Sequence, residues 1–397
     1  MKAYFSEKYI NSCTLYIILW GLYYLQGSLY PSGSIISQGI LAVLLFWSVF
    51  LTIKVNIEYK LPLLLMVLNT FIITLSLYGI ILIMGNEPLY MNNILSSRVS
   101  KSDYLKTLYI SLLPIYVMFH YVKRNILTDS LIRLFLVFWL IITIFLYIRV
   151  QLEFQTKMVE LGHNEDREMT NNIAYDFLHL FPLLFLWNRK PLFQYLFAAV
   201  MFAFIMAGMK RGAILIGAVC LIWFLYRVFV NAKGKGKILI LLCTMLLIYV
   251  GANYVMNLYE TSPYFKYRIE QTLEGNSSNR DVIYSSLWNI YNSDSSLLHF
   301  LFGNGASATL RVFGAYAHND WLELLINQGL LGAVLYAVYF AALLYTIYKN
   351  KNNKDVYSIL AMIFVIMFVS SLFSMSYASL GLPIAVGLGY CLNKSTV

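Results

Sequence analysis

The chain has 397 residues, of which 60% are hydrophobic and only 12% are charged, and its mean hydropathy is +0.67. A soluble domain carries about 25% charged residues, so this chain lacks the charge needed to cover a water-facing surface of its size. The formal net charge of +10 does not indicate nucleic acid as a partner, because the basic residues lie mainly in short loops between apolar runs. These properties exclude a soluble protein and predict an integral membrane protein surrounded by lipid.

The apolar residues fall into about 12 runs of about 20 residues, the length that crosses a bilayer as an α-helix. We therefore predict an all-α fold, a polytopic membrane helical bundle that forms a single transmembrane domain over residues 1–397. The first span is expected to act as an uncleaved signal, since no small-residue cleavage motif follows it. The predicted spans are 10–27, 35–53, 61–84, 104–121, 130–149, 171–187, 191–208, 211–230, 236–256, 322–347, 355–374 and 379–393.

The four cysteines lie in or at the edge of apolar runs, and none has a CxxC partner. This placement is typical of small buried apolar side chains and does not indicate a disulfide framework or a metal site. The four are Cys13, Cys220, Cys243 and Cys391.

Basic residues follow the even-numbered spans, which places those loops and both termini in the cytoplasm. The outward segments are then 85–103, 151–170 and the largest, 257–317, between spans nine and ten. Lys210 and Arg211 lie in the short outward link between spans seven and eight, against this rule, so we expect them to have another role. The cytoplasmic basic residues are Lys54, Lys60, Lys123, Arg124, Arg189, Lys190, Lys233, Lys235, Lys237, Lys349, Lys351 and Lys354.

The large outer segment contains one predicted amphipathic helix. Ser278 and Asp281 have the spacing of a capping box, which marks a helix start. Ile283, Leu287 and Ile290 form an apolar stripe on this helix, and we expect the helix to lie at the membrane surface. Tyr284, Trp288 and Tyr291 stand beside the stripe.

His318 and Glu323 are the first candidate site residues, where the outer segment enters span ten. An imidazole beside a carboxylate is a suitable general base. The alternative is an interfacial cap, with Asn319 capping the helix, Asp320 favouring its N-terminus and Trp321 anchoring it at the interface. From the residues alone the cap is the stronger interpretation.

Arg211 and Arg280 are the second candidate set, with Lys210 beside Arg211. Guanidinium groups match phosphate oxygens in a bidentate manner, so two of them suit a diphosphate. The alternative is contact with lipid headgroups, which is equally reasonable for Arg280 and less so for Arg211.

Other polar or small residues lie within the predicted spans. Asp176 and His179 share one face of span six, with Asn171 and Asn172 before them, and either line a cavity or pair structurally. Gly329 and Gly332 in span ten favour close helix packing. The sequence has no P-loop, no GxGxxG after a strand, no HExxH and no GxSxG, and its five histidines show no metal-ligand spacing, so neither an ATP-driven machine nor a metal enzyme is predicted.

Four segments in this order resemble the family of O-antigen ligases and polysaccharide polymerases. They are Lys210–Ala213, Asn279-Arg280 with Leu287-Trp288, Phe302–Gly305, and Ala317–Glu323 with Gly329 and Gly332. The resemblance lies within residues 207–215 and 278–335; elsewhere only the hydropathy is similar.

The resemblance implies a membrane-embedded, inverting glycosyltransferase of the GT-C class in the bacterial inner membrane, with its active site facing the periplasm. Its substrate would be a glycan on undecaprenyl diphosphate, and it would need no metal or other cofactor. Arg211 and Arg280, with Lys210, would hold the diphosphate. His318 would activate the acceptor hydroxyl or lie beside it, with Glu323 in support. Asn319, Asp320, Asp176 and His179 are candidates for the acceptor cavity, and a chain-length regulator or flippase is an expected partner.

That family has two activities, polymerase and ligase. The sequence of Ala317–Glu323, with the compact stretch before it, is more similar to the polymerases than to the ligases. A lipid-linked oligosaccharide transporter is the alternative outside the family. It should show internal repeats or paired broken helices, and the sequence shows neither.

Overall fold

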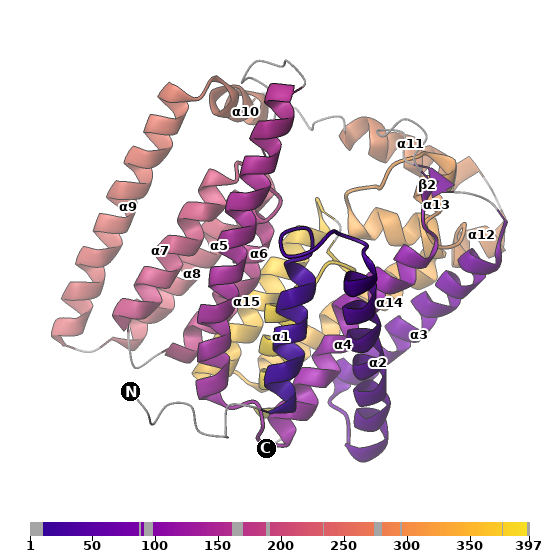
Figure 1. Cartoon of the computed structure of the whole chain (residues 1–397), viewed down its shortest axis with the longest axis horizontal. Helices are drawn as coiled ribbons and strands as arrows, with labels where there is room; N and C mark the ends of the chain where they lie inside the picture. Colours follow the sequence, from indigo (N-terminus) through magenta and orange to yellow (C-terminus); the bar gives the residue numbers. More distant parts are fainter. Residues whose placement is uncertain are drawn as a thin grey trace. The chain divides into compact units, whose positions relative to one another are not determined.

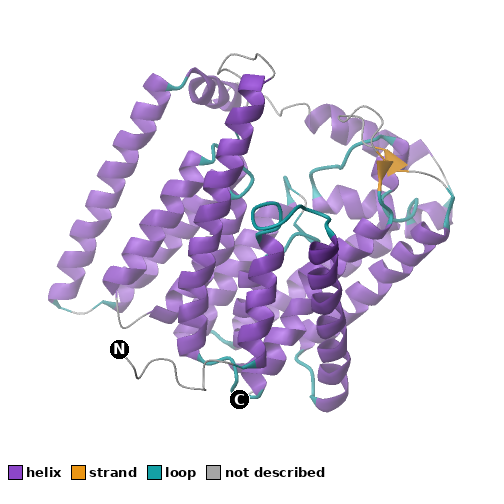
Figure 2. Ribbon diagram, viewed as in Figure 1, coloured by secondary structure: helices purple, strands orange, loops and turns teal. Residues whose placement is uncertain are grey.

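The computed structural model describes residues 11–86, 89–90, 98–160, 170–187, 191–232, 234–273, 280–293, 296–374 and 376–394. Most of them form helices, which Figure 1 shows in chain order and Figure 2 by structure type. The helices are α1 (Ser12–Tyr24), α2 (Ile35–Glu58), α3 (Leu63–Met84), α4 (Ser102–Lys123), α5 (Asp129–Glu160), α6 (Ala174–Leu180), α7 (Pro191–Ala207), α8 (Arg211–Asn231), α9 (Lys235–Thr261), α10 (Pro263–Leu273), α11 (Arg280–Ser293), α12 (Leu297–Phe302), α13 (Ala308–Val312), α14 (Asp320–Lys349), α15 (Lys354–Ser371) and α16 (Leu382–Lys394), with a 3-10 helix η2 (Phe181–Trp187) after α6.

The predicted helical fold is confirmed, with one small addition. Strands β1 (Leu89–Tyr90) and β2 (Arg98–Val99) pair antiparallel, Leu89 opposite Val99. Leu89 is buried against Leu82, Ala306 and Leu310, so this short ladder attaches the α3–α4 link to the region around α13.

The predicted spans coincide with helices, but the count of twelve crossing helices is not confirmed. Among the described residues, eight helices are long and apolar enough to cross a membrane: α2, α3, α4, α5, α8, α9, α14 and α15. Three further apolar helices, α1, α6 with η2, and α7, are shorter. Pro182 lacks a backbone N–H, and the chain takes 3-10 geometry around it.

The chain divides into two compact units. The first contains residues 1–44 and 124–276, and the second contains residues 45–123 and 277–397. The first unit thus holds α1 and α5 to α10, and the second holds α3, α4 and α11 to α16. That the two act as the predicted single domain stays a prediction.

The centre of the second unit is α16, which corresponds to the short, glycine-rich last span. Its residues from Leu382 to Leu392 are all buried. A Cβ on Gly389 would lie 2.6 Å from the backbone nitrogen of Phe119 in α4, so glycine permits the two helices to approach closely. Protein therefore surrounds this helix, which explains why its hydropathy resembles a span although it has only 13 residues.

Four basic residues of the second unit lie near the same end of its helices. The Tyr59 hydroxyl lies 3.3 Å from His120 Nδ1, and the Cys391 thiol lies 3.9 Å from the Val356 carbonyl. These contacts place the ends of α2, α4 and α16 beside the start of α15. The side of the membrane on which this end lies stays a prediction. Lys60, Lys123, Lys354 and Lys394 are within a few residues of these contacts.

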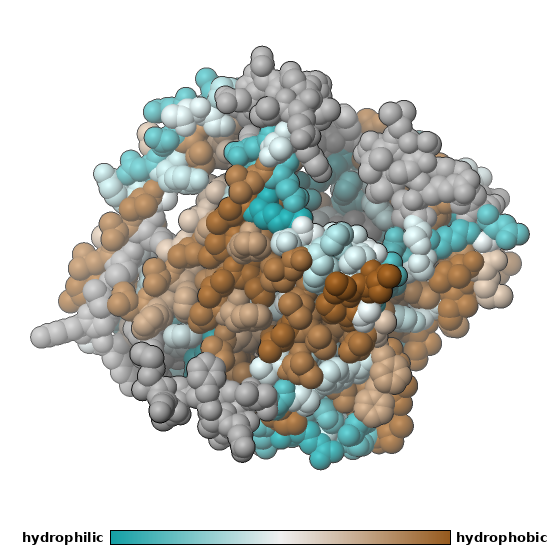
Figure 3. Space-filling model, in the orientation of Figure 1, coloured by the Kyte–Doolittle hydropathy of each residue, from teal (hydrophilic) through white to brown (hydrophobic). Residues whose placement is uncertain are grey.

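The faces of α2 and α3 that have no protein partner carry apolar side chains. Phe46 is 76% exposed and Ile81 is 67% exposed, and Figure 3 shows apolar side chains covering much of the visible face of the molecule. Such an apolar surface suits contact with lipid tails. The three cysteines whose side chains are described, Cys13, Cys220 and Cys391, are free and buried as predicted; the side chain of Cys243 lies outside the described residues.

Helix α14 is interrupted at Gly329, where φ is 65° and ψ is −159°. At this point the backbone of Gly303, whose φ is 68°, crosses it: a Cβ on Gly329 would lie 2.6 Å from the Leu301 carbonyl oxygen. The close approach predicted at Gly329 is therefore present, but the predicted continuous helix is not, because the positive φ of Gly329 breaks it. Gly332 does allow close packing, but against Gln328 and Leu324 of the same interrupted helix.

We predict that Gly329→Ala lowers the melting temperature of the detergent-solubilised protein. A left-handed conformation costs a non-glycine residue roughly 1–3 kcal/mol, and the added methyl group also meets backbone atoms of Leu301. The matched control is Gly251→Ala in α9, where nothing lies within 4 Å of the added Cβ. Equal melting temperatures for Gly329→Ala and the wild type would contradict the crossing.

Candidate functional site

Asn319 caps α14 and connects it to α15. Its Oδ1 accepts a hydrogen bond of 3.0 Å from the Leu322 N–H, and its Nδ2 donates to the Leu372 carbonyl at 3.0 Å. The predicted cap is confirmed. The Trp321 indole N–H donates to Ser371 Oγ at 3.0 Å, and its ring packs on Tyr336. Trp321 therefore anchors α14 to α15, and its place at the membrane interface stays a prediction.

Asp320 is fully buried and holds the segment that follows α15. Its carboxylate accepts hydrogen bonds from the Ser376 N–H at 2.8 Å, the Tyr377 N–H at 3.0 Å and the Tyr336 hydroxyl at 2.8 Å, and a fourth from the Ser376 hydroxyl. Four donors satisfy the carboxylate, so this geometry gives Asp320 a structural role and leaves its place in an acceptor cavity a prediction.

Glu323 is also buried, and it holds the segment that precedes α14. Its carboxylate accepts from the Thr309 hydroxyl at 2.6 Å, the Asn327 side-chain amide at 2.9 Å and the Ala317 N–H at 2.8 Å. Ala317 directly precedes His318. Glu323 therefore fixes the backbone from which His318 projects. The predicted pairing of its carboxylate with the imidazole is not formed, because the carboxylate binds these three donors instead.

His318 is exposed, and its backbone is left-handed, with φ of 53°. Its carbonyl oxygen accepts a hydrogen bond of 3.3 Å from the hydroxyl of Tyr284 in α11. Arg280 lies one turn before Tyr284 on the same face of α11. Burial raises the pKa of Tyr284, and the Arg280 charge opposes this rise. Arg280 is thus one helical turn from the residue that contacts the His318 backbone, although Arg280 and His318 are far apart in the sequence.

The apolar stripe of α11 packs against protein. Leu287 and Tyr291 are buried with Ala308, Ala317 and Ile326, and Ile283 and Ile290 pack against this cluster. The stripe therefore faces the N-terminal half of α14, and the position of this helix at the membrane surface stays a prediction. The helix begins at Arg280 as predicted, whereas Ser278 and Asn279 lie outside the described residues.

Lys210 and Arg211 belong to the first unit, in which Arg211 is the first residue of α8 and Lys210 its N-cap. The turn before them contains Met209 with φ of 51°, and the Gly208 carbonyl accepts a hydrogen bond of 3.0 Å from the Asn171 N–H. A Cβ on Gly208 would lie 2.8 Å from the Ala174 Cβ. The basic turn is therefore held against the start of α6.

Asp176 and His179 lie on one face of α6, as their spacing predicts. The Asp176 carboxylate lies 4.0 Å from His179 Nδ1. His179 Nδ1 is buried without a hydrogen-bond partner. Asn171, at the start of α6, donates to the Tyr147 carbonyl at 3.1 Å. Both interpretations of this polar group, cavity lining and structural pairing, stay predictions.

The candidate residues therefore fall into two groups. Within the second unit the structure brings together Arg280, His318, Asn319, Asp320 and Glu323. Within the first unit it holds the turn of Lys210 and Arg211 against the start of the segment that carries Asp176 and His179. Most partners of the second group carry no motif that the sequence analysis could identify; they include Thr309, Tyr336 and Ser376. Only the contact of Asn327 with Glu323 could have been predicted, because residues four apart on a helix lie on the same face.

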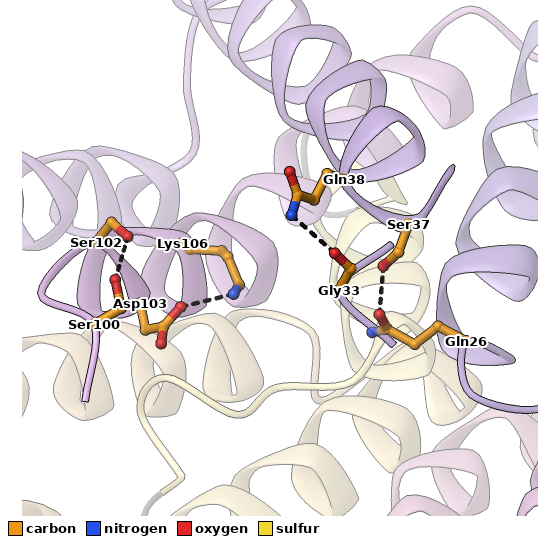
Figure 4. Close-up of polar contacts among 8 residues, drawn as sticks. All are labelled: Gln26, Gly33, Ser37, Gln38, Ser100, Ser102, Asp103 and Lys106. Carbon is orange, nitrogen blue, oxygen red and sulfur yellow. Dashed lines mark hydrogen bonds and ion pairs between the residues drawn. The ribbon is translucent and has the colours of Figure 1, made fainter. Parts of the chain in front are cut away.

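Two links between helices are ordered by polar contacts, which Figure 4 shows. In the first unit, the Ser37 hydroxyl donates to Gln26 Oε1 at 2.5 Å in the link between α1 and α2. In the second unit, Lys106 Nζ pairs with Asp103 at 2.7 Å in the first turn of α4. The neighbouring Tyr104 hydroxyl accepts a hydrogen bond of 3.1 Å from Gln328, beside the break in α14, so the start of α4 is fixed to the site region.

Among the described residues, no group of three His, Cys, Asp or Glu side chains is arranged to hold a metal ion. A transfer that needs no metal stays a prediction. No protein-family model matches the chain, and no curated protein matches it at a significant level. The site therefore rests on its own geometry and on the sequence resemblance.

We predict that Glu323→Gln lowers both the melting temperature and the activity. The Gln side chain would turn an N–H donor either toward the Ala317 N–H or toward the Thr309 and Asn327 donors, and losing a charge-assisted hydrogen bond costs about 1.5–3 kcal/mol. The control is Glu58→Gln, which breaks an exposed pair with Lys54 of 3.7 Å and should have a small effect. An unchanged melting temperature for Glu323→Gln would show that the three bonds do not stabilise the fold.

Proposed function

We propose that the protein is a bacterial polysaccharide polymerase, a membrane-embedded glycosyltransferase that joins repeat units carried on undecaprenyl diphosphate at the periplasmic face of the inner membrane. The observation that carries the proposal is the position of Arg280 and His318, connected by the Tyr284 hydrogen bond to the His318 carbonyl. A basic group suited to a diphosphate and a group suited to proton transfer are the two things this reaction needs.

In the proposed reaction the acceptor sugar hydroxyl attacks the anomeric carbon of the donor glycan. The new glycosidic bond forms as the bond from the anomeric carbon to the diphosphate oxygen breaks, and undecaprenyl diphosphate leaves. The hydroxyl proton passes to the His318 imidazole, and Arg280 stabilises the charge that develops on the diphosphate. We assign Arg211, with Lys210, to the same diphosphate, following the resemblance of its helix start.

The choice of polymerase over ligase rests on the resemblance of Ala317–Glu323 and on the compact stretch before it. Asp176 and His179 stay candidates for the acceptor side. These assignments imply a flippase upstream, because the donor must reach the periplasmic face before it can react.

One observation favours the alternative of a lipid-linked oligosaccharide transporter. Transporters place substrate or ions at broken helices, and α14 is broken at Gly329. In this chain, however, backbone carbonyls at the break already have donors: the Asn304 N–H bonds Ile326 at 2.9 Å, and the Gly305 N–H bonds Asn327 at 2.8 Å. This pairing supports a structural break, and we therefore place the enzyme first.

Deletion of the gene in the native host tests the proposal. We expect single repeat units to accumulate on undecaprenyl diphosphate, or to be found singly on the surface acceptor, because elongation stops. Long glycan retained on undecaprenyl diphosphate, with a bare acceptor, would instead identify a ligase. No change in either glycan pool would contradict both transferase functions and favour the transporter.

Substitutions in the complemented deletion strain test the residues. We expect Arg280→Ala, Arg211→Ala and His318→Ala each to abolish long glycan at normal membrane abundance, and Arg280→Lys to retain part of it, since lysine lacks the bidentate fork. The control is Arg227→Ala near the other end of α8, where the guanidinium lies 5.9 Å from the Trp223 ring. Wild-type glycan from all three alanine variants would refute the site.

A further inference from the structure

The hydroxyl of Tyr284 in α11 donates a hydrogen bond of 3.3 Å to the backbone carbonyl of His318. His318 directly precedes Asn319, the residue that caps α14. Tyr284 is only half-buried, yet it belongs to no part of the apolar cluster that holds α11 in place. Its contacts are therefore directed at the start of α14, where the candidate base lies.

His318 needs such a restraint. A left-handed backbone is unfavourable for any residue with a Cβ, and His318 adopts it with φ of 53°. Hydrogen bonds of the residues on either side restrain its backbone: the Ala317 N–H donates to Glu323, and the Asn319 side chain caps α14. The His318 carbonyl, which lies between these two points, receives its donor from Tyr284.

We propose that Tyr284 is a positioning residue of the transferase site, whose hydroxyl holds His318 in its left-handed conformation and in register with Arg280. The inference rests on the proposed function and deepens it. Arg280 and Tyr284 are one turn apart on a helix whose apolar stripe packs on Ala317 and Ile326, so the helix and the hydroxyl together set the separation of the two reacting groups. A transfer between donor and acceptor depends on such spacing, because a small misplacement removes the near-attack geometry.

Tyr284→Phe tests this directly, since it keeps the ring and removes only the hydroxyl. The matched control is Tyr291→Phe on the same helix, which removes a hydroxyl that also donates to a backbone carbonyl, that of Phe300 at 2.8 Å. The assay uses each purified variant in vesicles with undecaprenyl-diphosphate-linked repeat units extracted from the deletion strain. It measures kcat, KM for these units and the melting temperature.

We expect Tyr284→Phe to lower kcat by about tenfold, the order expected for one lost hydrogen bond that acts on the transition state. KM and the melting temperature should stay close to those of the wild type, and Tyr291→Phe should keep its kcat. Equal losses of kcat and melting temperature in both variants would show a purely structural role and overturn the proposal. So would a Tyr284→Phe variant with wild-type kcat.

Two further comparisons keep the outcome clear. If His318→Ala is inactive while Tyr284→Phe is normal, only this inference fails; if His318→Ala is fully active, the proposed function fails with it. If Tyr284→Phe does not fold, 4-aminophenylalanine at position 284 retains a donor and 4-methoxyphenylalanine does not. The first should then restore kcat relative to the second, and equal rates would overturn the proposal.

Discussion

The buried carboxylate of Glu323 is the interaction on which the site region depends. A carboxylate at the start of a membrane helix is stable only when its oxygens are hydrogen-bonded, and here three donors come from Thr309, Ala317 and Asn327. Two of these donors belong to the segment that returns to α14. Satisfying one charge therefore folds the whole stretch between α13 and α14 onto the helix that follows it. Asp320 does the same for the segment after α15.

The crossing of Gly303 and Gly329 completes this arrangement. Both glycines have a positive φ and no side chain, so the two segments of the chain approach more closely than any side chain would allow. The Asn304 and Gly305 N–H groups thereby reach the Ile326 and Asn327 carbonyls at the break. The N-terminal half of α14 is thereby enclosed by its own preceding loop and by α11. His318 is exposed beside this enclosure, although Ala317 directly before it is buried.

Much of this fold could be predicted from hydropathy, because apolar runs of bilayer length have few alternatives to helices. The partner of an apolar stripe could not be predicted in this way, because the spacing of Leu287 is the same whether it faces lipid or packs on Ile326. The break at Gly329 was missed because glycine is equally typical of packed helices and of left-handed turns. The short span from Leu382 was predicted, but its burial was not, since a buried helix and a lipid-facing helix have the same composition. At the site, Asn319 could be identified as a cap from local spacing alone. Two partners of Asp320, Ser376 and Tyr377, lie more than fifty residues away and carry no signal that one sequence can show.

The proposed polymerase must itself elongate a lipid-linked glycan. The decisive measurement uses purified protein in vesicles, supplied with undecaprenyl-diphosphate-linked repeat units and with EDTA but without any nucleotide sugar. We expect a ladder of products that increase by one repeat unit at a time, together with release of undecaprenyl diphosphate. Repeat units that stay single, in vesicles where the protein is folded and correctly inserted, would contradict it.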